Sequence, residues 1–323
     1  MSSVPEQNQS KVIADLTYRD YDGELKPPRF RWWVIAKDGM KQAVRKKGFT
    51  VWTLLSGYWY LILMVIFFFV TTTYSQLPAR AQERMSLNNV MWKDQFIEGF
   101  SRSQTLFLIL ALLVGAGSIA NDNRSNALLV YMSKPVRKFD YVFGKWLGIF
   151  LPLCAVTAGP MLTFYLYCAM SFRSFGFLED QPDLILRLFL IIPLPAALHA
   201  SLMLGVSSLF KQARLAGAAY AGLYFILNFM TALFWIVRTG LLADHKSSPQ
   251  ILETLYYCSI DGLLQGLGKA VLVTPGGVPF GNKSPVPPVP VPNGWVFFAV
   301  FLLLNAIGFL LAYRRVRAVE VVN

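Results

Sequence analysis

Side chains that could carry out catalysis or hold a metal ion do not gather at any point of this sequence. The two histidines, His199 and His245, do not cluster, and no nucleophile–base pair or carboxylate pair presents itself. The three cysteines, Cys154, Cys168 and Cys258, have neither the spacing of metal ligands nor that of a disulfide framework. We therefore expect no catalytic residue, no metal site and no bound cofactor in this chain.

One stretch partly matches a phosphate-binding loop. Residues Gly276–Ser284 follow the pattern G-x-x-x-x-G-K-[ST] as far as Gly281, but Asn282 occupies the position of the lysine that would reach the phosphates. The prolines that follow exclude the helix that such a loop opens. We interpret this stretch as a turn.

The composition is that of a membrane protein. Hydrophobic residues make up 55% of the 323 residues and charged residues only 15%, well outside the usual soluble composition. A helix that crosses the hydrocarbon needs about 20 mostly apolar residues. We predict an all-α membrane protein with six transmembrane helices, at Val51–Tyr74, Thr105–Ala120, Tyr141–Ser171, Leu184–Phe210, Leu215–Val237 and Trp295–Tyr313.

The placement of Lys and Arg predicts the orientation. With the N-terminus inside, 20 of the 30 Lys and Arg residues fall in the cytoplasmic pieces 1–50, 121–146, 211–214 and 314–323, whereas Asp and Glu divide evenly. This asymmetry follows the positive-inside rule, so both termini are predicted to be cytoplasmic. We expect no nucleic-acid partner, because no basic face with interleaved aromatic residues lies on a soluble domain.

The predicted domain organisation has three parts. Residues 1–28 are polar and end in two prolines, which favours a flexible cytoplasmic tail, and residues 29–48 are expected to form an amphipathic elbow helix on the inner leaflet. Residues 49–323 would form the transmembrane domain, with an outer segment at 238–294. Within that segment, Ile251–Val273 is broken by glycines, so we interpret it as short half-inserted or surface helices and not as a seventh span.

The elbow helix should present two different faces. Its apolar positions recur at helical spacing, and its basic residues form a stripe about 100° away. Two tryptophans suit the lipid headgroup interface. The apolar positions are Ala36, Met40, Ala43 and Val44, the basic stripe is Lys37, Lys41 and Arg45, and the tryptophans are Trp32 and Trp33.

The segment between the second and third spans has more local structure than a reversal of the chain requires. Residues 121–145 are polar and basic, and Asp122 could cap a helix over about Asn123–Met132. Pro135 would then start the next helix. A short helix held across the base of two spans could transmit a push from the cytoplasm, so we predict a coupling helix at residues 121–134.

Here the residues resemble a known family. The stretch from Arg124 to Gly148, RSNALLVYMSKPVRKFDYVFGKWLG, is similar to the signature of ABC-2 type transporter permeases. The six spans, the elbow helix and the cytoplasmic termini also resemble this family, in the type V exporter arrangement. The small pair that is commonly Gly-Thr in the family is Ser125-Asn126 here. The matching positions are Asp122, Arg124, Leu128, Leu129, Ser133, Pro135, Arg137, Tyr141, Gly144 and Lys145.

The resemblance implies the permease subunit of an ATP-driven exporter in the cytoplasmic (inner) membrane of a prokaryote. A separate ATP-binding cassette subunit would hold ATP and Mg²⁺ and dock on the coupling helix. A second permease subunit, identical or paralogous, would pair with this chain among the membrane lipids. The residues implied in coupling are Asp122, Arg124, Ser125, Asn126, Leu128, Leu129, Tyr131, Ser133, Pro135 and Arg137.

Two alternatives stay open. A non-transporting membrane subunit could use the same fold to anchor or assemble a larger complex. An ion-coupled carrier or channel is disfavoured because no Asp or Glu falls within the predicted spans, where such carriers commonly place a carboxylate. His199 is the one titratable group predicted at mid-span, and a lone histidine among leucines and alanines is more often a packing residue.

Overall fold

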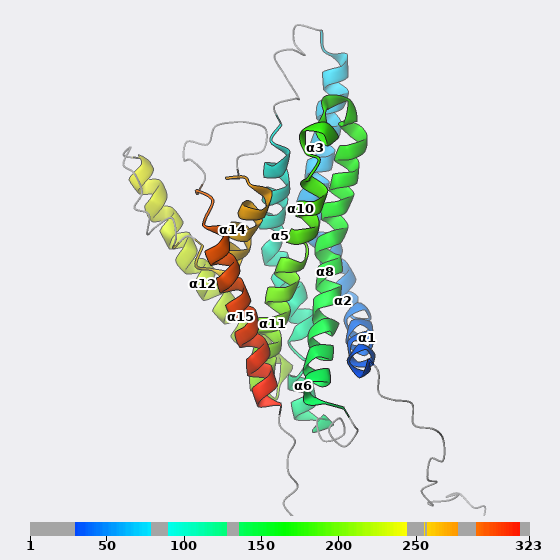
Figure 1. Cartoon of the computed structure of the whole chain (residues 1–323), viewed down its shortest axis with the longest axis vertical. Helices are drawn as coiled ribbons and strands as arrows, with labels where there is room; N and C mark the ends of the chain where they lie inside the picture. Colours follow the sequence, from blue (N-terminus) through cyan, green and yellow to red (C-terminus); the bar gives the residue numbers. More distant parts are fainter. Residues whose placement is uncertain are drawn as a thin grey trace, which may run out of the picture. The chain divides into compact units, whose positions relative to one another are not determined.

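The computed structural model describes residues 30–78, 90–127, 136–243, 255, 257–276 and 289–316. The chain divides into two compact units, Met1–Phe30 and Arg31–Asn323. In the described part of the second unit, every regular element is a helix (Figure 1). Six helices are long and apolar enough to cross a membrane, which confirms the predicted class of an all-α membrane protein with six spans.

The helices follow one another along the chain with few long connections. The first group is α1 (Arg31–Val44), α2 (Lys47–Ser56), α3 (Tyr58–Gln76), α5 (Trp92–Gly115) and α6 (Ala120–Arg124). The second group is α8 (Lys138–Ser171), the 3-10 turn η2 (Arg173–Phe175), α9 (Phe177–Asp180), α10 (Leu184–Ile191) and α11 (Pro193–Leu209). The last group is α12 (Ala213–Ala243), α14 (Ile260–Leu272) and α15 (Gly294–Arg315).

The bounds of the spans differ from the prediction. The first span begins at Tyr58 and not at Val51, because the helix is interrupted at Gly57, between α2 and α3. The second begins at Trp92, so Asp94 and Glu98 lie in its first turns. The prediction that no carboxylate falls within a span is therefore wrong for the helices as they fold. These carboxylates lie near the start of the helix, where the sequence is more polar than in its middle. A span placed by hydropathy therefore leaves this part of the helix out.

Helix α11 packs against four other spans. It contacts α5, α8, α12 and most extensively α15. Gly205 and Gly308 allow α11 and α15 to approach closely, since a Cβ on Gly205 would lie 2.7 Å from the carbonyl oxygen of Gly308. Two consecutive side-chain hydrogen bonds also link α8, α11 and α15. The indole N–H of Trp146 on α8 donates to Ser201 Oγ (2.9 Å), and Ser201 donates to Asn305 Oδ1 on α15 (2.7 Å).

Helix α1 packs along the first half of α8. The sequence around it has a G-x-x-x-G spacing, Gly144 and Gly148, which lets two helix backbones meet. A Cβ on Gly148 would lie 3.3 Å from the Cα of Gly39 on α1. On α1, Ala36 and Ala43 are buried, whereas Val44 is 57% exposed and, contrary to the prediction, does not share their buried face.

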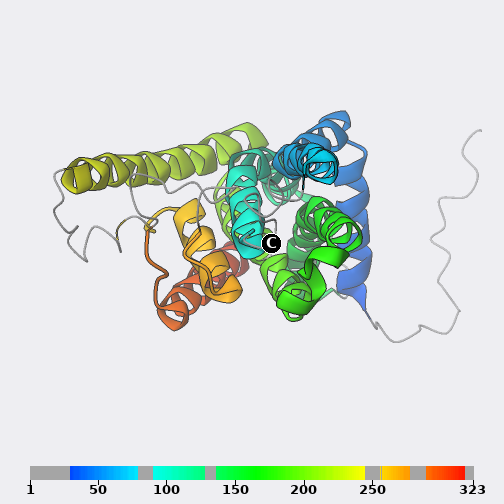
Figure 2. The ribbon, with the colours of Figure 1, turned by 90° about the horizontal axis from the view of Figure 1, so that it is seen from above.

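Helices α12 and α14 differ in their burial. Figures 1 and 2 show the later part of α12 leaning away from the other spans, and only 11% of its most apolar stretch is buried. Helix α14 is apolar but is not one of the six candidate spans. It packs against α5, α10, α12 and α15, and most of its residues are buried. The outer segment thus contributes a packed helix and no seventh candidate span among the described residues.

Candidate functional site

The short helix α6 follows α5 at the end of the second candidate span, Trp92–Arg124, and is fixed to α11. The hydroxyl oxygen of Ser207 on α11 accepts hydrogen bonds from the backbone N–H groups of Ile119 (3.2 Å) and Ala120 (3.0 Å). The same hydroxyl donates to the carbonyl oxygen of Ala116 (2.9 Å). One buried serine therefore satisfies donors that the first turn of a helix would otherwise leave without a partner.

Asp122 joins α6 to α8. Its Oδ2 atom accepts a hydrogen bond from the hydroxyl of Tyr141 (2.7 Å) and forms an ion pair with the Nζ of Lys145 (2.7 Å). The Lys145 and Asp122 side chains are only 14% and 17% exposed, so water screens their attraction weakly. The prediction that Asp122 caps a helix is wrong, because α6 has already begun at Ala120 and the carboxylate is engaged by α8.

The predicted coupling helix is not continuous over Asn123–Met132. Helix α6 ends at Arg124, and Asn126 has a φ of 53°, a left-handed conformation in which helices commonly end. The Ser125 hydroxyl donates to the carbonyl oxygen of Asn121 (2.9 Å). The predicted coupling residues that lie outside the described residues, and so stay predictions, are Leu128, Leu129, Tyr131, Ser133 and Pro135.

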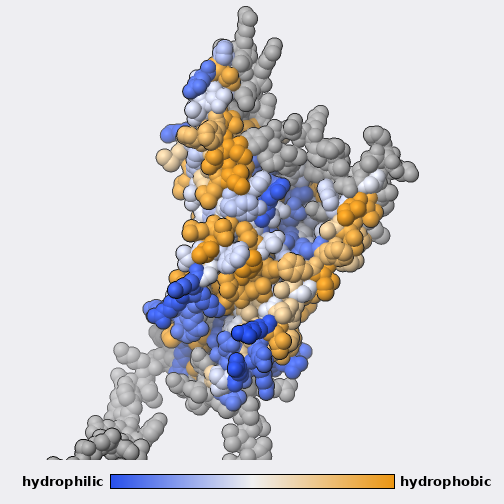
Figure 3. All heavy atoms as spheres, turned by 180° about the vertical axis from the view of Figure 1, so that it is seen from behind, coloured by the Kyte–Doolittle hydropathy of each residue, from blue (hydrophilic) through white to orange (hydrophobic). Residues whose placement is uncertain are grey.

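The outer side of α6 and the residue before α8 form an exposed polar surface. Behind this surface lie the contacts of Asp122, which face inward. Figure 3 shows hydrophilic side chains gathered at this end of the unit, below a broad apolar band. We call this region the α6 surface, and its exposed residues are Asn121, Arg124, Ser125, Asn126 and Arg137.

The predicted elbow residues divide between an exposed and a packed group. The basic stripe of Lys37, Lys41 and Arg45 is exposed on α1. Trp33 is 44% exposed. Trp32 instead packs edge-on against the ring of Phe143 on α8, with 5.4 Å between ring centroids. Helix α1 is thus attached to α8, the same helix that holds Asp122, and its role as an elbow stays a prediction.

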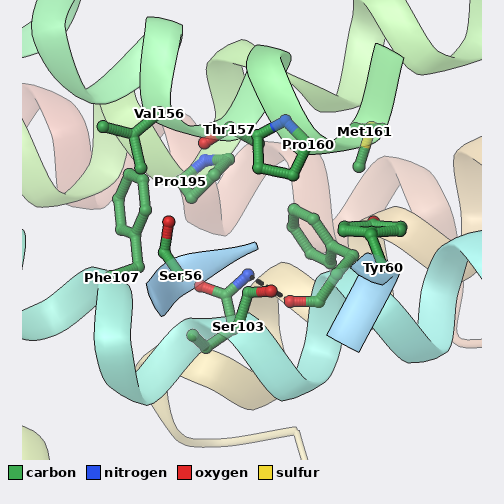
Figure 4. A pocket seen from close by; sticks show the side chains of 11 residues that line it. Ser56, Tyr60, Ser103, Phe107, Val156, Thr157, Pro160, Met161 and Pro195 are labelled. Carbon is green, nitrogen blue, oxygen red and sulfur yellow. Dashed lines mark hydrogen bonds between the residues drawn. The ribbon is translucent and has the colours of Figure 1, made fainter. Parts of the chain in front are cut away.

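A small pocket lies among α2, α3, α5, α8 and α11 (Figure 4). Its hydroxyl groups donate to carbonyl oxygens of their own helices or of α5, for example Ser103 to Gly99 (2.8 Å) and Tyr60 to Phe96 (3.0 Å). They therefore offer only acceptor oxygens to the pocket. Gln104 Oε1 is buried and has no hydrogen-bond partner among the described residues. With no charged side chain in its lining, the pocket suits a polar neutral molecule such as water and offers no catalytic group.

Sequence reasoning missed a half-buried carboxylate, one oxygen of which is fully buried. Asp261 lies in the first turn of α14, where its Oδ2 atom accepts a hydrogen bond from the hydroxyl of Tyr224 on α12. Burial raises the pKa of this carboxyl to about 6, although the hydrogen bond from Tyr224 opposes the shift. A tyrosine and an aspartate 37 positions apart give no recognisable motif. Only the packing of α14 on α12 reveals the pair.

These features define a class of protein: a helical membrane protein with six candidate spans, in which a short polar helix at the end of the second is joined to the third. A family model described as ABC-2 family transporter protein matches residues 32–317, and the chain belongs to that family. The recognised resemblance is thereby confirmed.

A curated relative is similar to part of the chain. Over 143 residues, the chain is 26% identical to a protein of Bacillus subtilis (strain 168) described as uncharacterized transmembrane protein YxlG. The match covers 44% of this chain and 53% of that protein, so the chain matches about half the length of this relative. That description says that the relative is a transmembrane protein and names no substrate.

Proposed function

We propose that this chain is the permease subunit of an ATP-driven transporter and that a separate ATP-binding subunit docks on the α6 surface. The observation that carries the proposal is the partly buried ion pair between Asp122 and Lys145 directly behind that exposed surface. An exposed polar turn alone would serve only solubility, whereas this one is fixed to two spans. Membership in a transporter family supports the transport role.

Contacts on two sides of α6 would carry its displacement into the spans. Asp122 holds α8, and Ser207 holds the start of α6 to α11. The amide of Asn123 donates to the carbonyl oxygens of Ser208 (3.3 Å) and Phe210 (3.2 Å) at the end of α11. A hydrogen bond to a charged group contributes about 1.5–3 kcal/mol. A push on α6 would therefore move α8 and α11 with it, as a rigid-body switch.

The energy for this movement is assigned to the partner subunit. The one sequence that partly matches a phosphate-binding loop has Asn282 in the position of the lysine. ATP and Mg²⁺ would therefore bind the ATP-binding cassette subunit.

Lys46, after the elbow helix, donates a hydrogen bond to the carbonyl oxygen of Leu113 near the end of α5, which fixes the elbow to the base of the second span.

Membrane lipids and a second permease subunit, identical or paralogous, complete the proposed transporter. Helices α12 and α15 expose large apolar side chains along much of their length, which suits contact with lipid and with another span. The distribution of Lys and Arg supports cytoplasmic termini and a cytoplasmic α6. The exposed stripe on α1 would contact lipid phosphates or the partner subunit. We assign the complex to the inner membrane of a prokaryote.

Charge reversal on the α6 surface tests the docking site. We expect Arg124→Glu to reduce recovery of the ATP-binding subunit with the full-length chain by about tenfold, which corresponds to about 1.4 kcal/mol. The matched control is Arg173→Glu, an exposed arginine beyond the opposite end of α8. Co-purification from native membranes measures both. Normal recovery with Arg124→Glu, or equal loss with both variants, would show that the partner docks elsewhere.

Turnover in the purified complex separates transport from anchoring. A permease should change the rate at which its partner hydrolyses ATP, because the two are mechanically linked. Stable association with no such dependence would favour a non-transporting subunit that assembles a larger complex.

A further inference from the structure

A polar tract runs through the packing of α11, α12 and α14, and the proposed coupling does not use it. Tyr220 and Tyr224 lie one turn apart on the same face of α12. Tyr224 donates to the carboxylate of Asp261 on α14, and the hydroxyl of Tyr220 lies 2.8 Å from Nδ1 of His199 on α11. The rings of His199 and Tyr224 lie 6.3 Å apart between centroids. Four polar side chains from three helices thus meet among buried apolar residues.

Two atoms of this tract lack partners. Asp261 Oδ1 and His199 Nε2 are both buried and have no hydrogen-bond partner among the described residues. A buried polar atom without a partner costs free energy, and an ionised carboxylate costs more than a neutral one. Protonation of Asp261 removes that charge, so the structure favours the neutral acid.

The charged groups that pack around the rest of α14 are engaged with other atoms. From α5, Asp94 accepts a hydrogen bond from Thr274, and from α10, Arg187 donates to the carbonyl oxygen of Val271 (2.5 Å). Lys269 of α14 itself donates to the carbonyl oxygen of Val289 (3.0 Å). Helix α15 meets α14 through apolar and glycine contacts at Phe297 and Gly294. Among the residues that the structure describes, the titratable groups that face Asp261 are therefore Tyr224 and Tyr220 of α12, with His199 of α11 behind them.

We propose that Asp261 and Tyr224 form a proton-binding site that controls how tightly α14 packs on α12. The ligand is a proton from water on the side of the bundle where α14 lies, against the first half of α5 and away from α6. A new O–H bond forms on the carboxylate, hydronium gives up the proton as water, and no other covalent bond changes. The site is independent of the coupling proposed for α6.

The way in which the stability of the packing depends on pH follows from the raised pKa of Asp261. Burial raises the pKa of Asp261 to about 6, above the ordinary value of about 3.9 for an unfolded chain. Between pH values equal to these two pKa values, the folded protein therefore binds more protons than the unfolded chain. The stability of the packing falls as pH rises through this window, and the protonated state is the tightly packed one.

Infrared titration of the full-length protein in lipid tests the site. We expect a protonated-carboxyl band with a midpoint near pH 6, which is lost in Asp261→Asn and kept in the control Asp183→Asn, whose carboxylate is 42% exposed. Tyr224→Phe removes the hydrogen bond that favours the ionised acid, so the midpoint should move to higher pH. A band that persists in Asp261→Asn, or a midpoint that Tyr224→Phe leaves unchanged or lowers, would overturn the proposal.

Hydrogen exchange in α14 gives a second readout that does not require the substituted site to bind a proton. After correction for intrinsic rates, we expect amides of α14 to exchange faster at pH 8 than at pH 5 in the unsubstituted protein. In Asp261→Asn, a neutral side chain of similar size, protection should be high at both pH values. Equal pH dependence in both proteins would show that Asp261 does not control the packing.

Discussion

Asp122 illustrates how one side chain can join two helices that the chain connects only indirectly. Its carboxylate accepts from Tyr141 and pairs with Lys145, so three side chains share one small volume at the base of α8. Lys145 also lies 5.6 Å above the ring of Tyr141. Because both charges are largely withdrawn from water, removal of either one breaks an ion pair at a partly buried site.

We predict that Asp122→Asn and Lys145→Met each lower the free energy of unfolding by about 1.5–3 kcal/mol, the usual contribution of a hydrogen bond to a charged group. The double variant should lose less than the sum of the two, because the second substitution then removes no additional pair. Denaturant unfolding in micelles measures this cycle. Strictly additive losses would contradict the ion pair.

The incorrect prediction that Asp122 caps a helix has a physical cause at the scale of single residues. The sequence pattern places an acidic residue before a run of helix formers, which is typical of a cap. The helix instead begins earlier, because the hydroxyl of Ser207 satisfies the N–H groups of Ile119 and Ala120. A donor–acceptor match between residues so far apart in sequence follows from the packing of α11, and no local pattern contains it.

At the scale of elements, α1, the predicted elbow, packs closely on α8. Glycines on both helices bring the backbones together, and Trp32 packs on Phe143 beside them. A side chain added at this contact would force the helices apart, which typically costs about 1–3 kcal/mol.

We predict that Gly148→Val separates α1 from α8, because its Cβ would lie 3.3 Å from the Cα of Gly39. Amides of α1 should then exchange faster with solvent. The matched control is Gly159→Val on the same helix, where an added Cβ would meet no atom within 4 Å. Hydrogen exchange followed by mass spectrometry compares the two. Unchanged exchange in α1 for Gly148→Val would show that this contact does not hold the elbow.

The elements were predictable to different degrees. Six spans follow from runs of apolar residues, because the hydrocarbon demands length and hydrophobicity alone. The residues at which the spans begin and end could not be predicted from these apolar runs. Asp94 and Glu98 lie in the first turns of α5, where Asp94 accepts from Thr274 and Glu98 pairs with Arg102. One of these partners is distant in sequence and the other lies one turn along the same helix; both make a charged residue compatible with a continuous helix, and a hydropathy average contains neither.

At the scale of the whole second unit, the polar features separate into two regions. The α6 surface lies after the end of α5, whereas Asp261 lies in the first turn of α14, against Tyr224 of α12. A partner on the first region and a proton on the second would act through different helices, α8 with α11 in one case and α12 with α14 in the other. Loss of one function is therefore expected to leave the other measurable.

The most direct test places a photo-crosslinking amino acid at position 124 of the full-length chain in native membranes, with position 173 as the control. We predict crosslinks from position 124 to an ATP-binding subunit, because Arg124 is exposed on α6 directly in front of the Asp122–Lys145 pair. Position 173, beyond the far end of α8, should give none to that subunit. Crosslinks to the ATP-binding subunit from position 173 alone, or from neither position, would contradict the assignment of α6 as the coupling element.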